Sequence, residues 1–530
     1  MKNILILSII SISFLLPAME YTPSPDYWED QNIYFIMTDR FANGDRSNDD
    51  FGKGEFNPEH FGAYHGGDLQ GIIDKLDYIK ALGATAIWIT PHIQNQWVSP
   101  KYGRSQYFGY HGYWAQDFYK VDPHLGTMDE YKKFVKAVHD KGMYVIQDIV
   151  CNHMGDFVSA DGKNEALTGY PEKAAYPFDN KDLFHYNGTD IYETGFAGTL
   201  DDLKTEDQFV KDQLIAIFKF WISEADIDGY RIDTVKYVKM DFWKEFCKEI
   251  KDYAASLGKK DFLIFGEDYE YDDVKDFKYD EAEKKQGAYT GTDEEPIFNS
   301  MLDFVFSGIV TQTIAGASIA GGVTNDNPQY GSFKAFEKKY SITTQKYYTE
   351  ESKNRLVTFI DNHDMSRFLY QAKADGDQKK LLLAVTLMYT LPGIPCLYYG
   401  TEQGFSQPWV KQDGAVTSNN RQDLWDSNYT TDTELFKSIA KIAEIRNSHT
   451  ALRTGRYVSR IIDGNDGAIF SYSRIADGDE VVVIINRSMK RQKVTPVTDI
   501  SGVLVNLLTG KKVGKTITML PQSSMILKSF

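Results

Sequence analysis

Residues 229–237 read GYRIDTVKY, and the apolar run at 230–235 lies between polar segments. A run of this length predicts a short buried strand. Arg231 and Asp233 are two residues apart, so in a strand their side chains would point the same way. Because a buried aspartate is costly unless it is paired, the motif predicts either a structural Arg–Asp ion pair or an ionised carboxylate aimed into a pocket.

Short apolar runs alternate with amphipathic helical segments on both sides of this strand. The predicted strands span residues 32–37, 85–90, 144–150, 230–235, 262–265, 301–306, 356–360 and 394–399. The predicted helices span residues 66–83, 128–141, 206–224, 241–257, 377–390 and 433–447. Eight strands that alternate with helices predict the α/β class, and within it a (β/α)8 TIM barrel rather than an open sheet.

Two regions depart from this alternation. About fifty residues rich in Gly, Asp, Tyr and Asn follow the third strand, long enough for an inserted subdomain. From residue 451 onward, runs such as DEVVVIINRS (479–488) and ISGVLVNLL (500–508) predict a C-terminal antiparallel β-sandwich. We therefore expect a barrel at 19–151 and 206–450, an inserted domain B at 152–205 and a β-sandwich domain at 451–530.

The first 18 residues have the layout of a secretory signal peptide, with Lys2, an apolar run at 4–16 and the small residue Ala18. The run is too short for a membrane span, so we expect export to the periplasm or the medium and no span after signal removal. The three cysteines are odd in number and far apart, which predicts no disulfide framework.

Composition narrows the range of partners. With 530 residues, 42% of them apolar, the chain can bury a large core. The net charge of −17 opposes phosphate backbones and anionic membranes, so nucleic acid is not an expected partner. Aromatic residues make up 14% of the chain, and exposed aromatic rings suit weakly polar ligands such as sugars. We expect a monomer.

Polar residues follow four of the predicted strands. They are Asp148, Asn152 and His153 after the third, Arg231 and Asp233 on the fourth, Glu267 and Asp268 after the fifth, and 361–364 (DNHD) after the seventh. Any one could be a cap or turn residue, but four barrel strand ends meet at the active-site face. Three carboxylates facing one cavity favour glycoside hydrolysis, in which one attacks and another protonates the leaving oxygen. A metal centre built from His153, His363 and carboxylates is the alternative, although the spacing matches no compact zinc motif.

The loop 38–50 reads TDRFANGDRSNDD and predicts a second kind of site. Asn43, Asp45, Asn48 and Asp49 place four oxygen-bearing side chains within seven residues, and Gly44 permits a tight turn. Hard oxygen ligands at this density suit Ca²⁺. The alternative is a solvated polar turn.

Four separated motifs resemble the α-amylase family, glycoside hydrolase family 13, over nearly the whole mature chain: DIVCNH (148–153), GYRIDTVKY (229–237), FGED (265–268) and FIDNHD (359–364). GYHGYWAQDFY (109–119) is similar to the family's sugar-stacking segment, and LDDLK (200–204) to its calcium motif. The resemblance implies a retaining mechanism with Asp233 as nucleophile, Glu267 as general acid/base and Asp364 as the third carboxylate. It implies substrate contacts by His111, Tyr113, His153, Arg231, Lys236 and His363.

The resemblance also implies two calcium sites. The first would use the side chains of Asn152 and Asp202 and the backbone carbonyl of Tyr237, where α-amylases typically have His. The second is similar to a site of cyclodextrin glucanotransferases and would use Asn43, Asp45, Asn48, Asp49, Gly66 and Asp68.

Residues 234–236 (TVK) and LDDLK favour cleavage of α-1,4 over α-1,6 bonds, whereas TDRFANGDRSND, FIDNHDMSRF and YYGTEQ look like glucanotransferase segments. That enzyme type normally carries two more domains after the β-sandwich, and cyclodextrin-degrading relatives carry an extra N-terminal domain. We therefore expect an exported endo-acting α-amylase that acts on starch, glycogen or maltooligosaccharides. A cyclodextrin- or maltooligosaccharide-acting hydrolase or transglycosylase, and a non-catalytic glucan-binding subunit, are the alternatives; intact Asp233, Glu267 and Asp364 argue against the last.

Overall fold

The computed structural model describes residues 20–98, 107–158, 173–186, 188, 190–193, 200–269, 279–317, 331–373, 378–408, 410–412, 415–417, 419–476, 478–499 and 502–529. The expected signal peptide, residues 1–18, lies outside the described residues. Within these ranges, every helix is too short or too polar to cross a bilayer.

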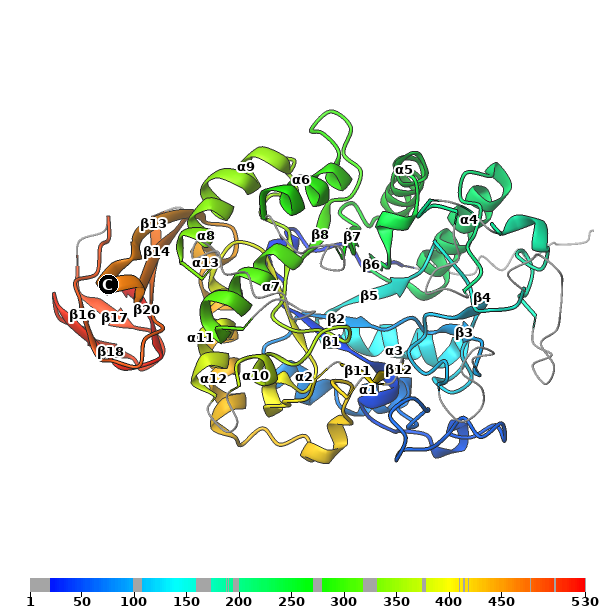
Figure 1. Cartoon of the computed structure of the whole chain (residues 1–530), viewed down its shortest axis with the longest axis horizontal. Helices are drawn as coiled ribbons and strands as arrows, with labels where there is room; N and C mark the ends of the chain where they lie inside the picture. Colours follow the sequence, from blue (N-terminus) through cyan, green and yellow to red (C-terminus); the bar gives the residue numbers. More distant parts are fainter. Residues whose placement is uncertain are drawn as a thin grey trace, which may run out of the picture.

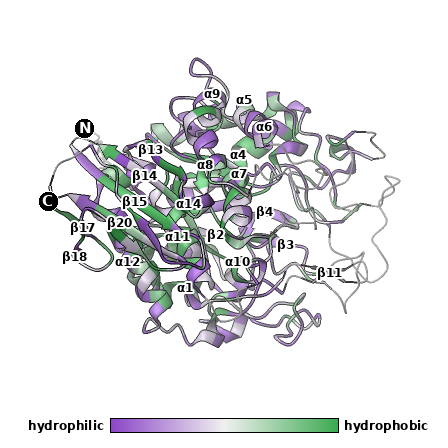
Figure 2. Cartoon of the chain, turned by 60° about the vertical axis from the view of Figure 1, so that its left-hand side comes forward, coloured by the Kyte–Doolittle hydropathy of each residue, from purple (hydrophilic) through white to green (hydrophobic). Residues whose placement is uncertain are grey.

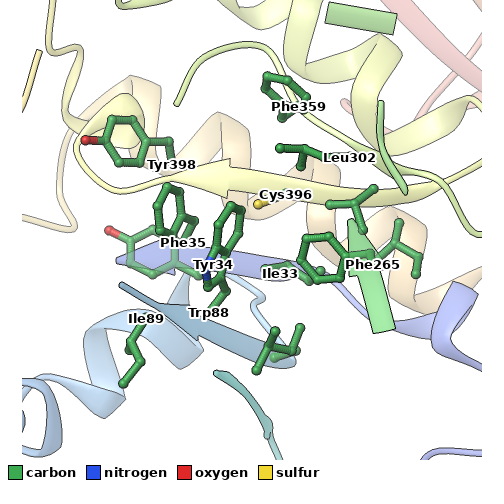
Figure 3. Close-up of a cluster of buried hydrophobic side chains, with 14 of the residues drawn as sticks. Ile33, Tyr34, Phe35, Trp88, Ile89, Phe265, Leu302, Phe359, Cys396 and Tyr398 are labelled. Carbon is green, nitrogen blue, oxygen red and sulfur yellow. The ribbon is translucent and has the colours of Figure 1, made fainter. Parts of the chain in front are cut away.

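Among the described residues, eight parallel strands close into a barrel, as predicted (Figure 1). They are β1 (Ile33–Ile36), β2 (Ala86–Ile89), β5 (Tyr144–Ile149), β6 (Gly229–Ile232), β7 (Leu263–Gly266), β8 (Ser300–Asp303), β9 (Val357–Thr358) and β10 (Ile394–Tyr398). Every residue of these strands except Tyr144 is buried, because helices cover the outside and side chains fill the inside. In this interior the rings of Phe35 and Trp88 are stacked, with their centroids 3.7 Å apart. Phe265 and Leu302 lie nearby (Figure 3).

The helices around the barrel are α1 (Leu69–Asp74), α2 (Leu76–Ala81), α3 (Met128–Asp140), α4 (Gln208–Ala225), α5 (Met240–Ser256), α6 (Tyr279–Thr290), α7 (Phe304–Val310), α8 (Lys334–Lys338), α9 (Thr344–Tyr347), α10 (Phe368–Gln371), α11 (Lys379–Thr390), α12 (Glu434–Ser448) and α13 (Thr450–Arg453). Helix α3 begins with a capping box between Thr127 and Glu130. The predicted single helix at 66–83 is wrong: Asp68 caps α1, and Lys75 leaves helical geometry between α1 and α2.

Two predicted strands end three residues earlier than expected. The strand at 301–306 stops at Asp303, whose carboxylate caps α7 by accepting a hydrogen bond from the Phe306 N–H at 2.8 Å. The strand at 230–235 stops at Ile232. Thr234 adopts a left-handed conformation with φ 51°, which is strained for a β-branched residue, and the 3-10 turn η5 (Val235–Tyr237) follows. Asp233 therefore projects from the end of the strand rather than from its middle.

The C-terminal region forms a six-stranded antiparallel sheet in the order β13-β14-β15-β20-β17-β18, with a two-stranded sheet, β16-β19, against it. Their bounds are β13 (Arg456–Asp463), β14 (Ile469–Ala476), β15 (Asp479–Asn486), β16 (Gln492–Val494), β17 (Leu504–Asn506), β18 (Lys511–Lys512), β19 (Ile517–Met519) and β20 (Ser523–Ser529). On β15, Val481 and Val483 join the core shared with the barrel, whereas Val482 and Ile484 join the smaller core beneath β16-β19. Burial on both faces explains the unbroken run of apolar residues here.

The C-terminal sheet lies at one end of the molecule, away from the antiparallel pair β3 (Ile93–Asn95) and β4 (Ala115–Val121) (Figure 2). The expected inserted domain leaves the barrel after β5 and returns where His153 pairs with Asp202 in an isolated antiparallel bridge. Of that domain the structure describes residues 152–158, 173–186, 188, 190–193 and 200–205, with the short helix η4 (Lys181–Leu183).

Candidate active site

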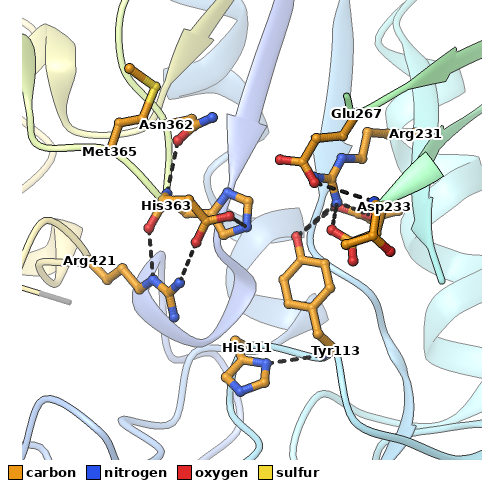
Figure 4. Close-up of polar contacts among 12 residues, drawn as sticks. His111, Tyr113, Arg231, Asp233, Glu267, Asn362, His363, Met365 and Arg421 are labelled. Atoms are coloured by element: carbon orange, nitrogen blue, oxygen red, sulfur yellow. Dashed lines mark hydrogen bonds and ion pairs between the residues drawn. The ribbon is translucent and has the colours of Figure 1, made fainter. Parts of the chain in front are cut away.

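Arg231 lies beside Asp233 and Glu267 among the polar residues that follow the barrel strands (Figure 4). Its side chain is fully buried and contacts three carboxylates from three neighbouring strand ends: Nη1 is 2.8 Å from Asp148 Oδ1 and 2.9 Å from Asp233 Oδ1, and Nη2 is 2.7 Å from Glu267 Oε2. The Arg–Asp ion pair that the sequence predicts is therefore present. Arg231 pairs with the enclosed Asp148 and also with the two carboxylates expected to react.

Asp148 is the enclosed member of this group. Its Oδ2 accepts hydrogen bonds from Tyr113 OH at 2.9 Å and from Trp88 Nε1 at 3.0 Å. Burial raises the pKa of Asp148 to about 6, and Arg231 opposes that rise. With its oxygens bound to Arg231, Tyr113 and Trp88, Asp148 holds the guanidinium in place rather than facing a ligand.

Asp233 and Glu267 lie next to each other because Arg231 pairs with both, and the pKa of each is raised. Burial raises the pKa of Glu267 to about 8; Arg231 opposes the rise, and the charges of Asp233 and Asp364 add to it. Burial also raises the pKa of Asp233, but Arg231 opposes the rise. The proton therefore resides on Glu267. One carboxyl can donate a proton while its neighbour stays ionised.

Asp364 is the third carboxylate, and part of its side chain is exposed (37%). Its Oδ2 lies 3.1 Å from His363 Nε2 and its Oδ1 lies 2.9 Å from Arg421 Nη2. Burial opposes ionisation, but the contacts with His363 and Arg421 lower the pKa of Asp364 below its usual range. Asp364 therefore stays ionised and accessible, as a group that stabilises developing positive charge must be.

The predicted substrate-binding residues lie around the carboxylates, except for one. The rings of Tyr113 and His363 are stacked, with their centroids 5.4 Å apart. The Tyr113 N–H donates to His111 Nδ1 at 3.1 Å. Burial lowers the pKa of both His153 and His363 to about 3, so both imidazoles are neutral hydrogen-bonding groups. Lys236 instead donates from Nζ to the Tyr269 carbonyl, two residues beyond Glu267.

Arg421 is a site residue that the sequence prediction missed. Besides Asp364, it contacts the His363 carbonyl through Nε at 3.0 Å and Tyr110 OH through Nη1 at 3.0 Å. The adjacent Asn420 donates from Nδ2 to the carbonyls of Asn362, His363 and Met365. Residues 420–421 therefore clamp the loop that carries Asp364. They follow the last barrel strand, so extending the reading of strand ends to β10 is the signal that could have found them.

Replacing Arg421 by Met is expected to lower kcat/KM for starch by about 10- to 100-fold, because a loosened Asp364 no longer meets the reacting sugar in the right geometry. Arg421→Lys should recover part of the loss, since it keeps a cation beside Asp364. Initial rates should be measured well below the melting temperature of each variant, with Arg460→Met as a control that removes an arginine of the C-terminal sheet. Full activity in folded Arg421→Met would contradict the role.

The residues predicted for the first calcium site lie where domain B returns to the barrel. Leu203 N–H donates to the Asn152 carbonyl at 2.9 Å, which brings Asn152 and Asp202 together, and Tyr237 ends the turn η5. Asp202 Oδ2 contacts His185 Nδ1 at 2.7 Å. Burial raises the pKa of Asp202 to about 6, and His185 opposes the rise. The carboxylate that a calcium ion would need is therefore already hydrogen-bonded to a histidine.

The second predicted calcium site shows a closer fit. A Cβ atom at position 66 would lie 2.5 Å from both Asn43 Nδ2 and Asp49 Oδ1. Glycine therefore lets the backbone pass this close to the two side chains. Within the described residues, Asn43 Oδ1 and Asn48 Oδ1 are buried without a hydrogen-bond partner. Asp68 Oδ2 accepts from the N–H groups of Gly44 and Asp45, and Asp45 accepts from Ser47 N–H.

Across the part of the chain that the structure describes, no group of three or more His, Cys, Asp or Glu side chains is placed to hold a metal. An ion bound at the second site would therefore depend on amide and carbonyl oxygens as well as carboxylates. Such a donor set suits Ca²⁺ rather than zinc. The zinc-like alternative built from His153 and His363 gains no support from the described residues.

The chain is similar to known proteins in both sequence and structure. The family model "Alpha amylase, catalytic domain" matches residues 35–434. A β/α-amylase of Paenibacillus polymyxa is 36% identical over 484 residues, which cover 88% of this chain but only 34% of that protein. The solved α-amylase of Anoxybacillus superposes with a TM-score of 0.73 at 32% identity, covering 95% of this chain and 99% of the other. A solved cyclomaltodextrin glucanotransferase, CldA, gives a TM-score of 0.76 at 28% identity and covers 96% and 99%.

Proposed function

The chain belongs to the α-amylase family, and we propose that it is a glycoside hydrolase that cleaves internal α-1,4-glucosidic bonds of starch, glycogen or maltooligosaccharides. The observation that supports this most directly is that Arg231 pairs with both Asp233 and Glu267, at 2.9 and 2.7 Å, and so holds the two carboxyl groups side by side. Carboxyl groups this close fit a retaining mechanism, because inverting enzymes separate them by about 6.5–9.5 Å to admit a water molecule.

In the proposed first step, Asp233 attacks the anomeric carbon while Glu267 gives its proton to the leaving glycosidic oxygen. The C–O bond to the leaving sugar breaks, and an ester bond to Asp233 forms. Asp364, fixed by Arg421, would stabilise the positive charge that develops on the ring. In the second step Glu267, now ionised, takes a proton from water, which attacks the same carbon and releases Asp233 with the α-configuration restored.

Glucan transfer is the second candidate function. The expected domain count does not separate the two, because the solved glucanotransferase CldA has "a three-domain ABC distribution" and matches nearly the whole of this chain. A glucanotransferase with three domains therefore exists beside the type that normally carries two more. What distinguishes the candidates is whether water or a sugar hydroxyl attacks the glucosyl-enzyme.

Products of starch, pullulan and cyclodextrin, separated by chromatography, test the proposal. We expect linear α-maltooligosaccharides from starch, with the α-anomer formed first in a proton NMR time course. Cyclic products from starch would instead establish transfer, and panose from pullulan would establish a broader substrate range. First formation of the β-anomer would rule out the retaining mechanism.

We also propose that Ca²⁺ binds the second site, formed by Asn43, Asn48 and Asp49 with the Gly66 carbonyl, and that Asp45 and Asp68 complete or support it. The orphaned amide oxygens of Asn43 and Asn48 support this assignment. Asn152, Asp202 and the Tyr237 carbonyl remain the candidates for the other site. Bound Ca²⁺ would link the loop to the barrel through contacts with oxygen ligands on both. It takes no part in the proposed reaction.

Chelation by EGTA is expected to lower the melting temperature by several degrees, because an ion that binds only the folded chain stabilises it; a loss of about 2–3 kcal/mol is typical when free ligand is at 100 times Kd. Added Ca²⁺ should restore the value. Asn48→Ala should shrink the shift, whereas Asn57→Ala, in an exposed part of the same loop region, should not. A melting temperature insensitive to EGTA in the native protein would exclude both calcium sites.

Export after removal of residues 1–18 is the remaining part of the proposal, supported by the sequence pattern alone. N-terminal sequencing of the protein recovered from periplasm and medium tests it. A mature chain that begins near residue 19 is the expected result, and a protein retained in the cell with Met1 in place would contradict it.

A further inference from the structure

Three successive backbone carbonyls, beginning at Glu267, each accept a hydrogen bond, two of them from the turn η5 and one from α6. The Glu267 carbonyl accepts from Val235 N–H at 3.1 Å. The Asp268 carbonyl accepts from Gln286 Nε2 at 3.4 Å, and the Tyr269 carbonyl accepts from Lys236 Nζ. The backbone that carries the proposed acid/base is therefore fixed on the side facing α6 by one buried amide side chain.

Gln286 is in turn held by a buried chain of polar contacts. Tyr348 OH donates to Gln286 Oε1 at 3.3 Å and lies within electrostatic reach of Glu283, one helical turn before Gln286. Lys339 Nζ contacts Glu283 Oε1 at 2.5 Å and Asp303 Oδ2 at 3.0 Å. We call Glu283, Asp303 and Lys339 the Lys339 cluster. Its three side chains are at most 1% exposed.

Burying these charged groups carries a desolvation cost. Well-packed apolar residues at the same positions would stabilise the contact between the helices as well or better. Lys339 begins η8 (Lys339–Thr343), a π-helical segment, and such segments recur at functional sites. The cluster spans α6, η8 and the end of β8, the barrel strand paired with β7, which leads into Glu267. Stability alone therefore gives a weaker account of it than a role in fixing geometry.

We propose that the Lys339 cluster, acting through Tyr348 and Gln286, positions Glu267 for proton transfer by anchoring the Asp268 carbonyl. The inference rests on the proposed function, in which Glu267 protonates the leaving oxygen. A general acid must stay within about 0.5 Å of its productive geometry, and a displacement of about 1 Å can cost two orders of magnitude in rate. Lys339, Tyr348 and Gln286 are positioning residues: they touch neither the substrate nor the reacting atoms.

Gln286→Leu is the primary test, because it removes both hydrogen bonds while keeping a similar volume. Two substrates should be compared by kcat/KM: a maltooligosaccharide, whose leaving sugar needs protonation, and α-maltotriosyl fluoride, whose fluoride leaves with little help from an acid. We expect about a tenfold loss on the maltooligosaccharide, a fraction of the 10²–10⁴-fold effect of general acid catalysis. On the fluoride we expect a change of less than about twofold, since the acid contributes little there.

Lys339→Met should show the same selective loss, and Lys338→Met is its matched control, because Lys338 pairs with Asp280 at the partly exposed end of the same helix. Equal losses on both substrates in folded Gln286→Leu, or no loss on either, would overturn the positioning role. Because Lys339→Met leaves Glu283 and Asp303 unpaired and could prevent folding, the decision rests on Gln286→Leu. A wild-type protein that cleaves neither substrate would remove the proposed function, and the positioning role with it.

Discussion

Asp233→Asn is expected to abolish starch cleavage while leaving the fold intact. The amide cannot form the ester bond to the anomeric carbon, and the loss should reach about 10⁴-fold or more, as for removal of other catalytic nucleophiles. The fold should tolerate the change because Arg231 keeps its contacts with Asp148 and Glu267. Rates on soluble starch and the melting temperature, measured on the same preparation, give the two readouts.

Azide provides a positive control for this assignment. In Asp233→Gly, azide can enter the space of the missing carboxylate and attack from that face, giving a β-glycosyl azide from a substrate with a good leaving group. In Glu267→Ala, azide should instead attack the glucosyl-enzyme and give the α-azide. Undiminished starch cleavage by Asp233→Asn, or the opposite pattern of azide products, would remove Asp233 from the nucleophile role.

Glu267→Gln is expected to lower kcat/KM for starch by about 10²–10⁴-fold and to remove the alkaline limb of its pH profile. In the native protein, burial raises the pKa of Glu267 to about 8, so the proton that it must donate is lost as the pH rises through that value. Activity should therefore fall above about pH 8. On the acid side, activity should fall as Asp233 gains a proton, because the attacking carboxylate must be ionised.

The pH dependence of kcat/KM, recorded between pH 4 and 10 for the native protein, Glu267→Gln and Glu249→Gln, checks this prediction. Glu249 pairs with Lys219 on the surface of α5, so its variant should keep the native profile. A native profile without an alkaline limb, or a Glu267→Gln variant that retains one at the same pH, would show that another group supplies the proton.

The sequence predicted the barrel well because its signal is local. An apolar run and an amphipathic helix can each be recognised from the residues of that segment alone. Eight repeats of this pair are compatible with only a few topologies. The errors fall where a long-range contact decides the local geometry. Lys75, which breaks the predicted helix at 66–83, places its ammonium 4.2 Å from the ring of Tyr429. Asp303 ends its strand where one carboxylate oxygen caps α7 and the other pairs with the distant Lys339 at 3.0 Å.

The residues of the candidate site also fall into two groups, those that the sequence predicts and those that the structure reveals. Asp233, Glu267 and Asp364 could be found from sequence because a parallel barrel brings every strand end to one face, whatever the details of packing. Arg421 follows the last barrel strand but lies well beyond its end, so the same rule points to it only weakly. It lies 57 residues from Asp364, in a loop whose sequence carries no periodic signal, and its contact exists only because Asn420 draws the two loops together.

The sequence by itself therefore determined the barrel and the types of residue at its strand ends, because both follow from hydrophobic periodicity and topology. Only the tertiary structure decided which carboxyl keeps the proton, since the pKa of Glu267 depends on its burial and on charges contributed by other strands. It also decided that Arg231 joins three carboxylates rather than one, and that Gln286 and the Lys339 cluster lie behind Glu267. Such contacts depend on how loops and helices pack against each other, and no local pattern of residues records that packing.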